Sequence, residues 1–532
     1  METNNGNISH NPTGGQSANL KFPVGQQSFE VLRKQDCIYI DKTPYIEQIV
    51  KSGNRYFFLG RPRRFGKSLF LSTLQCFFEG KRELFKDTYI DSTDCTWEKH
   101  PVLYLDLNIK KYKEKGDLEL VLDNLFSGWE KQFDIEKTTD DFSIRFKNII
   151  YGAYKASGDK EVVVLVDEYD KPLVNNLHDQ EQFEYYRDKL AEIYSNFKSS
   201  APYLRLVFLT GVSRFAKLSV FSGLNNISDI TFQGRYASIC GVTEQESVDN
   251  FQAGIQRLAD KYGTTPREMH DRIKRHYDGY HFSENCPDIY NPFSLMSLMD
   301  SEEFMNFWIE SGTPSLLWEQ LKRFDVDLES ILNTECSIRR MQGLDLDTDS
   351  PVALFYQTGY LTIKDYDDGI YTLGLPNEEV KQGFMEYLLP HYANIANSDS
   401  LLYVRNFVRD LKSGDTEGFM LRLQKMFAKT SYDMEMDSER NLHNALYVFM
   451  LLLGLKVKAE YRTSNGRIDL FIATDKYYYI IEIKINQSAQ AALDQINSKN
   501  YALPFQAEGR RIVKIGVNFS TADRTLSDWL VE

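Results

Sequence analysis

The 532-residue sequence has few cysteines, no long apolar run and no excess of basic residues. Its 6 cysteines are scattered without a CxxC pair or a spacing typical of zinc ligands, so we expect free thiols in a reducing cytoplasm. The longest apolar stretch, residues 445–454, is too short to cross a bilayer. Residues 1–20 lack the basic start and apolar segment of a secretion signal. The sequence therefore predicts a cytoplasmic protein with no membrane partner and a disordered tail over residues 1–20.

The net charge of −14 argues against a chain that coats nucleic acid with its whole surface. It does not exclude a nucleic-acid site, because only the local field at a site matters. Aromatic residues make up 13% of the chain and hydrophobic residues 42%, which favours packed domains over disorder. A chain of this length is expected to form roughly two to four domains.

Strands alternate with helices in the expected structure of residues 21–240. Short, nearly continuous apolar runs occupy 56–60, 102–108, 161–168 and 204–211, with helical stretches between them. Such runs are typical of a parallel sheet that is buried on both faces. We therefore predict an α/β domain with a parallel sheet over this part of the chain.

Two further regions follow: a mostly helical middle region, residues 241–395, and an α/β region, residues 401–532, joined by a linker at 397–400. The middle region contains no motif with chemistry of its own, and a helical lid and a winged-helix-like module remain alternatives. It is expected to include a hairpin at 359–376, turning at the DYDDG segment. The elements predicted after the linker are helices to about 455, strands at 468–473 and 477–485, a helix near 487–500, and a last strand at 511–519.

The segment GRPRRFGKS, residues 60–68, resembles a phosphate-binding loop between a strand and a helix. Such a loop needs converging backbone N–H groups, a Lys for the β- and γ-phosphates, and a hydroxyl for magnesium. Gly66, Lys67 and Ser68 occupy those positions, whereas Arg61 replaces the usual first glycine. Together with Arg63 and Arg64 it brings three cations to the turn, which suits either a polyphosphate or a solvated surface.

A second motif, VVVLVDEYD, is an apolar strand that ends in two acids, as in a Walker B strand. Asp167 is expected to hold magnesium, and Glu168 to orient and deprotonate the attacking water. The next strand would supply a sensor of the γ-phosphate, for which Thr210 is the first candidate and Ser213 the second. Arg214 is either a phosphate contact or an ordinary surface residue. The two motifs in this order predict a P-loop NTPase domain.

Near the C-terminus, Asp469 begins one predicted strand and Glu482-Ile483-Lys484 lies in the next. Strand alternation puts Glu482 and Lys484 on one face. Two carboxylates that meet across a hairpin, with the backbone carbonyl of Ile483, would form a magnesium site. Lys484 could then activate water, as in the nuclease pattern D-x(n)-E-x-K. The pattern alone is weak, but charged residues in an otherwise apolar strand are costly without a purpose.

Residues outside this pattern are secondary candidates for the same site. Gln495 and Tyr501 follow on the next helix and loop and match the nuclease pattern QI…Y. Glu439 could face the site as an acidic helix residue does in many nucleases, or be an exposed helix residue. His443 could face it too, or be a core imidazole.

Several segments together resemble the bacterial AAA-ATPase-like family, whose members commonly end in a PD-(D/E)XK nuclease-like domain. They are YIDKTPYIEQIV, RPRRFGKSLFLSTL, VVVLVDEYDKPL, FLTGVSRFAKLSVFSGLNN and the later pieces YDGYHF, YNPFSL, ESGTPSLL, FYQTGYLTI and LGLPNEEV. The loop of that family typically has the sequence RPRRFGKS, so the presence of Arg61 in place of the first glycine looks like a trait of the family. His276 occupies a place where the family would have Trp.

The resemblance implies a fold, cofactors and partners. It implies a P-loop ATPase domain, a helical middle region and a restriction-endonuclease-like α/β domain, with ATP and Mg²⁺ as cofactors. It implies nucleic acid, DNA in preference to RNA, as a partner, and it allows a homo-oligomer. Residues 39–46, YIDKTPYI, could contact adenine or be a helix start capped by Asp41 or Thr43. The loop residues implied to contact ATP are Arg64, Phe65, Gly66, Lys67, Ser68 and Leu69.

Three hypotheses follow from these motifs. The first is an ATPase coupled to a magnesium-dependent nuclease. The second is a nucleotide-gated regulatory or binding protein whose nuclease fold is catalytically silent, because such folds also occur as inactive binding modules. The third is a structural ATP-binding protein without turnover.

Overall fold

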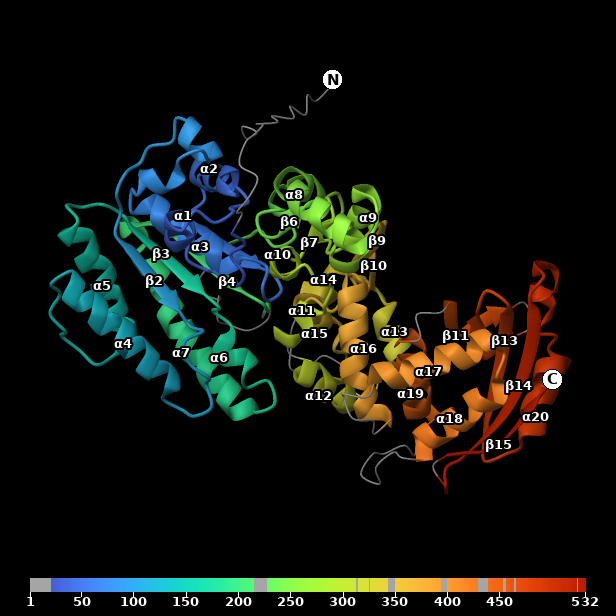
Figure 1. Ribbon diagram of the computed structural model, residues 1–532. Helices are drawn as coiled ribbons and strands as arrows, with labels where there is room; N and C mark the ends of the chain where they lie inside the picture. The colour runs from blue at the N-terminus through green and yellow to red at the C-terminus, as the bar shows by residue number, and fades with distance from the viewer. Residues whose placement is uncertain are drawn as a thin grey trace.

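A computed structural model shows an N-terminal α/β part, a helical middle and a C-terminal α/β part, with the middle lying between the other two (Figure 1). The predicted tail, residues 1–20, and most of the predicted linker lie outside the described residues. None of the helices in the described residues combines the length and apolar character that a membrane crossing requires. The described residues are 21–214, 227–311, 314–324, 326–342, 350–393, 400–428, 439–452, 456–463, 466–523 and 525–532.

The N-terminal sheet is parallel, as predicted, and has the strand order β2-β3-β4-β1-β5. Its strands are β1 (Tyr56–Gly60), β2 (Val102–Asp106), β3 (Val162–Asp167), β4 (Leu204–Gly211) and β5 (Ser228–Asp229). All residues of β1 and β3 are buried, which explains their continuous apolar sequences. The order brings the carboxyl ends of β1, β3 and β4 together at one edge, where ligands bind in sheets of this type.

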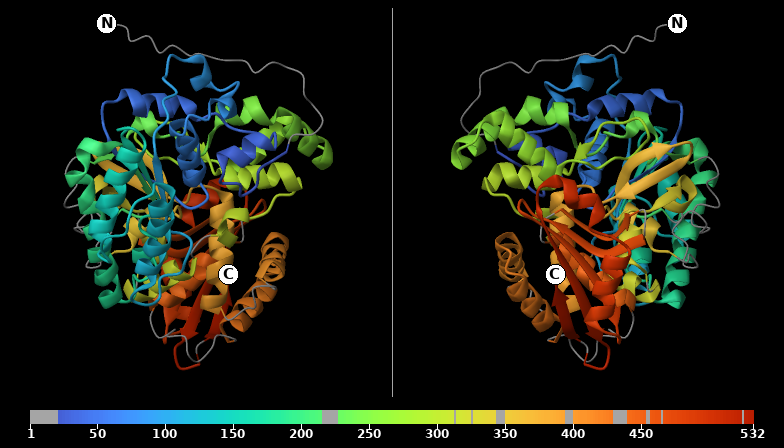
Figure 2. Two further views of the ribbon diagram at one scale, coloured as in Figure 1. Left: turned by 90° about the vertical axis from the view of Figure 1, so that its left-hand side faces the viewer. Right: turned by 90° about the vertical axis from the view of Figure 1, so that its right-hand side faces the viewer.

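Helices lie on both sides of this sheet (Figures 1 and 2). Helix α3 starts directly after β1 and the loop, and it contacts β2, β3 and β4. Helices α4, α5 and α7 form another layer, in which α5 contacts both of the others. The helices of this part are α1 (Phe29–Lys34), α2 (Thr43–Lys51), α3 (Lys67–Phe78), α4 (Asp117–Gln132), α5 (Phe142–Ala156), α6 (Lys171–Val174) and α7 (Gln180–Ser199).

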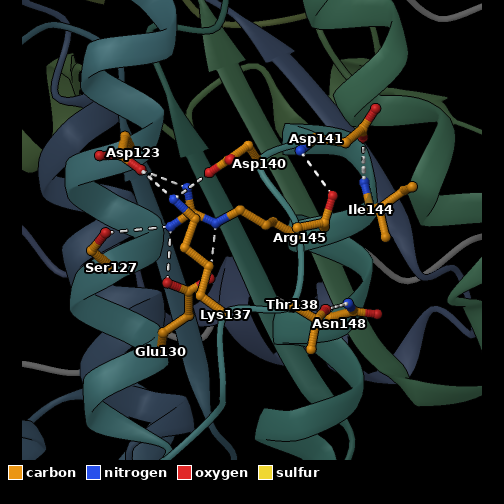
Figure 3. A network of polar contacts seen from close by, with 11 residues as sticks. Asp123, Ser127, Glu130, Lys137, Thr138, Asp140, Asp141, Ile144, Arg145 and Asn148 are labelled. Carbon is orange, nitrogen blue, oxygen red and sulfur yellow. Dashed lines mark hydrogen bonds and ion pairs between the residues drawn. The ribbon is translucent and has the colours of Figure 1, made fainter.

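A buried arginine joins α4 to α5 (Figure 3). The Arg145 side chain is 2% exposed and donates from Nε and Nη2 to the two carboxylate oxygens of Glu130, at 2.8 and 2.9 Å. Its Nη1 donates to Asp123 at 2.5 Å and its Nη2 to Ser127 at 3.3 Å. This fork-shaped contact satisfies a charge that burial would otherwise make costly.

Replacing Arg145 with Met is expected to destabilise the protein by about 3–5 kcal/mol, because Glu130 is left charged and buried without its partner. Urea unfolding followed by far-UV circular dichroism measures the change. The control is Lys155→Met on the same helix, which breaks an exposed pair with Asp159 beyond the end of that helix and should cost far less. Equal effects of the two substitutions would contradict the prediction.

The middle region is mostly helical, as predicted, with short strands. Capping boxes begin two of its helices, at Thr243–Glu246 and Thr265–Glu268. Its helices are α8 (Glu244–Tyr262), α9 (Pro266–Tyr277), α10 (Pro292–Ser301), α11 (Phe307–Ser311), α12 (Pro314–Phe324), α13 (Leu328–Leu332), α14 (Ile338–Gln342), α15 (Val352–Gln357) and α16 (Glu378–Ala393). Its strands are β6 (Val242–Thr243), β7 (Ile289–Tyr290), β8 (Glu335–Ser337), β9 (Thr362–Asp367) and β10 (Ile370–Gly374).

The predicted hairpin is present as β9 and β10, which turn at Asp368 and Gly369. From α13 to β10 the chain runs helix, strand, helix, helix and hairpin, and the small sheet has the order β8-β10-β9. This is the element order of a winged helix. All six residues of α15 are buried, and Gln357 at its end accepts a hydrogen bond from the backbone N–H of Arg214 at 2.8 Å. Helix α15 is therefore packed against other parts of the protein and is not exposed on its surface.

The C-terminal part contains a mixed sheet with the order β11-β12-β13-β14-β15. Strands β13 and β14 are parallel and the other neighbours antiparallel. Its helices are α17 (Ser400–Ser413), α18 (Thr416–Ala428), α19 (Glu439–Leu452) and α20 (Ala489–Ser498). Its strands are β11 (Lys456–Thr463), β12 (Gly466–Ala473), β13 (Tyr477–Ile485), β14 (Arg511–Ser520) and β15 (Thr525–Val531).

Two strands of this sheet were absent from the sequence prediction, and the strand predicted as the last is followed by another. Both β11 and β15 are edge strands that contain several polar or charged residues. An edge strand pairs on one side only and is often partly solvated, so it lacks the apolar run of a central strand. The central strands β12, β13 and β14 carry that run and were predicted.

Helix α16 connects the middle region to the C-terminal part. It packs against α9, α11 and α12 of the middle region and against α17 and α19 of the C-terminal part. Next to it, the Asn444 side chain on α19 accepts from the N–H of Leu328 at 2.9 Å and donates to the carbonyl of Val326 at 3.0 Å. One hydrophobic core runs from the N-terminal sheet through α16 to the C-terminal sheet.

Candidate functional sites

The loop between β1 and α3, predicted to bind phosphate, contains two residues with a positive φ. Gly66 lies just before α3 with a φ of 93°, in the left-handed region that favours glycine. Arg64 also has a positive φ, 62°, which is strained for a residue with a side chain. As at any helix N-terminus, the first N–H groups of α3 have no partner within the helix, which is the arrangement that suits an anion.

Lys67 is held at the centre of this loop. It is 4% exposed, and its Nζ donates to the carbonyls of Arg61 and Pro62, both at 3.0 Å. The Glu168 carboxylate lies 3.7 Å from the same Nζ. An ammonium group has three N–H donors, so the loop carbonyls engage two of them. The structure thus brings Lys67 and Glu168, which are 101 positions apart in the sequence, to one point.

Arg61 is a structural residue of the loop, which neither sequence interpretation predicted. It is 1% exposed, so it is not solvated surface, and it is absent from the lining of the adjacent cavity. Its guanidinium donates to the carbonyls of Gly60 and Thr231, both at 2.8 Å, and to those of Tyr236 and Ala237, at 3.1 and 3.3 Å. The side chain that replaces the usual glycine therefore fastens the loop to the segment after β5. Arg63 and Arg64 do line the cavity.

Of the two acids predicted for a Walker B strand, Asp167 is the last residue of β3 and Glu168 follows it. The carboxylate of Asp167 accepts from the hydroxyl of Thr210 at 2.6 Å and from that of Tyr104 at 3.3 Å. Glu168 has a φ of 54°, a conformation that costs a residue with a side chain about 1–2 kcal/mol and is typical of functional sites. Thr210 is fully buried and acts on Asp167, so its role as a phosphate sensor stays a prediction.

The third acid of the DEYD motif, Asp170, was missed by the sequence analysis. It is 1% exposed and accepts from the N–H groups of Val212 and Ser213, at 3.1 and 2.6 Å. Burial, together with the charge of Glu168, raises the pKa of Asp170 to about 6. Its contacts hold the turn after β3 against the end of β4. Arg214, a predicted alternative phosphate contact, forms an ion pair with Asp229 at 2.7 Å.

A cavity of about 390 Å³ opens beside the loop. This volume falls in the range of sites for small molecules. Residues 63–70 line it on one side, with Glu168, Lys171 and Asn108 nearby, and Tyr39, Ile40 and Lys42 line another part. The segment 39–46 thus reaches the cavity. It also begins a helix, since Asp41 accepts from the N–H of Thr43 at 2.9 Å.

Residues of the middle region pack against the loop between β1 and α3 and form a hydrogen bond with it. Trp308 is fully buried, and its indole N–H donates to the carbonyl of Arg63 at 3.1 Å. Gly359 has a φ of 90°, and a Cβ there would lie 2.8 Å from the Cβ of Pro62. Phe65 is fully buried, with its ring edge-on to those of Tyr280 and Phe282 at centroid distances of 4.8 and 5.4 Å. The loop is therefore fixed by residues that are more than 200 positions away in the sequence.

Glu379 at the start of α16 positions Trp308. Its Oε1 accepts from the backbone N–H of Trp308 at 2.8 Å and from the hydroxyl of Ser294 at 3.0 Å. Its Oε2 is buried and has no hydrogen-bond partner among the described residues. Burial raises the pKa of Glu379 from 4.5 to about 7.

Glu379→Gln is expected to stabilise the protein, relative to wild type, more strongly at pH 8 than at pH 5. Because the folded state raises the pKa of Glu379, its contribution is complete below pH 4.5 and is lost as the pH rises through about 7. The loss amounts to about 3 kcal/mol, which Gln does not share. Urea unfolding of both proteins at the two pH values measures the difference. The control, Glu378→Gln at a 46% exposed position, should show no such change, and an equal pH dependence of the two variants would contradict the prediction.

The second candidate site lies where β12 and β13 separate. Leu470 pairs with Ile481, so Asp469 and Glu482 follow next to each other across the two strands. The Asp469 carboxylate accepts from the backbone N–H of Ile483 at 2.8 Å. Because the N–H and C=O of one strand residue point the same way, the Ile483 carbonyl faces the side of Asp469 too. The structure thus brings together the residues of the D-x(n)-E-x-K pattern.

Glu482 is the most constrained residue of this site. It is 1% exposed, and its Oε1 accepts from Gln495 and, at 3.3 Å, from Lys484 Nζ. Its Oε2 is buried without a hydrogen-bond partner among the described residues. Burial and the nearby charge of Asp469 raise the pKa of Glu482 to about 7. A divalent cation fits this donor set, because it would engage the free oxygen and stabilise the charged carboxylate.

The surroundings of the second site include predicted and unpredicted residues. Tyr501 is buried, and its hydroxyl would lie 2.7 Å from a Cβ at Gly466, so this glycine allows close packing at the start of β12. The side chains of Glu439 and His443, which were predicted to face the site, lie outside the described residues. Within the described residues there is no group of three or more His, Cys, Asp and Glu side chains that could hold a metal, so backbone oxygen or water would complete the site.

Comparisons with known proteins match the two parts of the chain that contain these candidate sites. A family model described as "Predicted AAA-ATPase" matches residues 23–221, and one described as "PD-(D/E)XK nuclease superfamily" matches residues 437–529. A protein of Azotobacter chroococcum mcd 1, described as "Uncharacterized protein in vnfD 5'region", is 34% identical over 531 residues, which cover 96% of this chain and 99% of the relative.

A solved structure titled "Structure of Drosophila ORC bound to AT-rich DNA and Cdc6" is 12% identical and covers 68% of this chain and 93% of the matched chain. Its TM-score of 0.19 is too low to support a structural argument. The family assignment depends on the two family models and the near full-length relative. The chain belongs to the family of predicted AAA-ATPases that end in a PD-(D/E)XK nuclease superfamily domain.

Proposed function

We propose that this protein hydrolyses ATP at the loop after β1 and uses nucleotide binding to control a magnesium-dependent nuclease at Asp469, Glu482 and Lys484. The observation that carries the proposal is the free oxygen of the buried Glu482 carboxylate, opposite Asp469 and beside Lys484. A buried carboxylate with an unused oxygen costs stability, and a bound cation would remove that cost. The domain boundaries we propose are 21–240, 241–395 and 401–532.

In the ATPase site, Lys67 and the N–H groups at the start of α3 would bind the phosphates. Ser68 and Asp167 would hold the magnesium ion, and the ion would neutralise the negative charge of the phosphates. Glu168 would orient the attacking water and take its proton, and Thr210 would position Asp167 through the 2.6 Å hydrogen bond.

In the nuclease site, Asp469, Glu482 and the carbonyl of Ile483 would hold the second magnesium ion. The ion supplies a stronger nucleophile and neutralises phosphate charge. Lys484 lies on the same face of β13 as Glu482, so its ammonium group would orient the water and stabilise the negative charge that builds up on the phosphate. Gln495 would keep Glu482 in place through its hydrogen bond.

The middle region offers a physical route between the two sites. Trp308 contacts the loop at Arg63, Glu379 on α16 holds Trp308, and α16 packs against α19 of the C-terminal part. A change in the loop on nucleotide binding can therefore shift α16 and, through it, α19. We propose that this route makes cleavage depend on ATP.

The test is a cleavage assay on the purified full chain with Mg²⁺ or Mn²⁺. Linear and supercoiled DNA, single-stranded DNA and RNA are each offered without nucleotide, with ATP and with a non-hydrolysable ATP analogue. We expect cleavage of DNA in preference to RNA, a dependence on nucleotide, and no cleavage by Asp469→Asn. ATP hydrolysis without any cleavage would favour the alternative function, a nucleotide-gated binding protein. Size-exclusion chromatography with light scattering, with and without ATP, tests whether a homo-oligomer forms.

A further inference from the structure

The cavity beside the loop between β1 and α3 has a strongly positive lining. Of the described residues that line it, five carry a positive side chain and one carries a negative one. The positive residues are Lys42, Arg63, Arg64, Lys67 and Lys171, and the negative residue is Glu168. One carboxylate cannot neutralise five cations, and partly buried charges without a partner are costly. The lining therefore lacks negative charge, which a bound polyanion would supply.

Three of these cations are already engaged inside the protein. Lys42 Nζ donates to both carboxylate oxygens of Glu246, at 2.7 and 2.8 Å. The Arg64 guanidinium lies over the ring of Phe293, 4.6 Å from its centroid. Lys67 Nζ donates to two carbonyls of the loop. The charges of these three residues are thus at least partly balanced without a ligand.

Arg63 and Lys171 differ from the other three cations. Both side chains are half-buried, and within the described residues neither forms an ion pair or donates a hydrogen bond. Burial, together with the charge of Arg63, lowers the pKa of Lys171, although the carboxylates of Glu168 and Asp170 oppose this shift. The surroundings of Lys171 therefore disfavour its charged form, and an anion bound beside it would remove that cost.

Arg63 and Lys171 lie in the two segments that carry the key residues of the proposed ATPase. Arg63 is in the loop, four residues before Lys67. Lys171 follows Glu168 in the next turn of the chain, and its backbone N–H donates to the Glu168 carbonyl at 2.9 Å. Lys67 and Glu168 meet at 3.7 Å, and the lysine of a phosphate-binding loop reaches the β- and γ-phosphates. The two cations without a partner thus line the part of the cavity where the terminal phosphate would lie.

We propose that Arg63 and Lys171 bind the γ-phosphate and make this site prefer a nucleoside triphosphate to a diphosphate. This role rests on the proposed function at the same loop and assigns recognition of the last phosphate to two particular residues. The γ-phosphate would bring negative charge and acceptor oxygens to both side chains, and guanidinium and ammonium groups are suitable donors for a phosphate. A diphosphate would leave both cations without a partner.

The first experiment measures the affinity of the full chain for two nucleotides in the presence of Mg²⁺. Isothermal titration is carried out with ADP and with a non-hydrolysable ATP analogue, so turnover does not affect the result. Wild type should bind the analogue more tightly than ADP. Arg63→Met and Lys171→Met should each weaken binding of the analogue by roughly 10- to 10²-fold and leave the affinity for ADP within about twofold of wild type.

Further variants separate phosphate recognition from folding. Lys171→Arg keeps the cation and should keep the preference for the analogue, and thermal melting without nucleotide shows whether each variant is folded. Where a Met variant is not folded, Arg63→Gln or Lys171→Gln, which keep a polar side chain, take its place. Lys189→Met removes a 40% exposed lysine on α7 and should bind both nucleotides as wild type does.

The outcomes distinguish this role from the proposed function. If folded Arg63 and Lys171 variants lose affinity for both nucleotides equally, or lose none, the γ-phosphate assignment is overturned while the ATP site stands. Wild type that binds neither nucleotide would overturn the assignment together with the proposed function.

A second experiment supplies the terminal phosphate separately from the nucleotide. Beryllium fluoride, which binds next to ADP in place of a γ-phosphate, is added to wild type and to Lys171→Met. It should tighten ADP binding by roughly 10-fold or more in wild type and by less than about twofold in the variant. An equal gain in both proteins would show that Lys171 does not contact the γ-phosphate.

Discussion

Glu482→Gln is expected to lower metal-dependent cleavage by at least about 10³-fold while ATP hydrolysis stays within about twofold of wild type. The substitution keeps the size of the side chain and its contact with Gln495 but removes the negative charge that a cation needs. A metal ion contributes several kcal/mol to phosphoryl chemistry, and each 1.36 kcal/mol is about tenfold in rate. Isothermal titration with Mn²⁺, next to the cleavage assay, should show metal binding lost together with activity.

Lys484→Met separates chemistry from metal binding in the same site. Because the ammonium group acts on the water and the developing charge, its loss should lower cleavage by roughly 10²- to 10³-fold and leave Mn²⁺ binding in place. The matched controls are Lys514→Met and Glu532→Gln, which disrupt a Lys–Glu pair of 2.9 Å between β14 and the residue that follows β15. Both controls should cut like wild type. If Glu482→Gln and Lys484→Met also cut like wild type, the nuclease site is assigned wrongly.

Lys67→Ala is expected to remove ATP binding and hydrolysis together. A charge-assisted hydrogen bond contributes about 1.5–3 kcal/mol, so the loss of Lys67 should weaken ATP binding by roughly 10- to 10²-fold. Its further effect on the transition state should lower hydrolysis by roughly 10²- to 10³-fold. The substitution also leaves two loop carbonyls without their donor, so thermal melting without nucleotide must accompany the assays. Lys51→Ala, at a 55% exposed position on α2, is the control.

Glu168→Gln distinguishes turnover from binding. If Glu168 takes the proton of the attacking water, its amide should bind ATP as wild type does and hydrolyse it roughly 10²- to 10⁴-fold more slowly. Cleavage by this variant then shows whether nucleotide binding or hydrolysis controls the nuclease. Turnover unchanged from wild type would mean that Glu168 is not the base and would leave a structural role for the bound nucleotide.

The sequence was informative about features that depend on residues adjacent in the chain. Gly66, Lys67 and Ser68 are adjacent in the chain, and the strand before them and the helix after them follow from a change in hydrophobic period. The same holds for Asp167 and Glu168 after an apolar strand. Asp469 and Glu482 came together because a hairpin with a period of two leaves little choice of face or register.

The sequence was uninformative where the contact partners lie far apart. Nothing local marks Trp308 as the partner of the Arg63 carbonyl, or Gly359 as the residue that makes room for Pro62. Arg61 in a loop of cations suggested a phosphate or solvent, yet its guanidinium is buried among four backbone carbonyls. The edge strands β11 and β15 were missed because pairing on one side needs no apolar run.

The sequence by itself thus predicted the family, the order of the parts and the residues of two candidate sites. Only the tertiary structure decided how the loop after β1 is held, and that α16 lies between it and the C-terminal sheet. Local motifs are encoded by backbone period and a few adjacent side chains, whereas contacts across more than 200 residues depend on whether whole surfaces pack together.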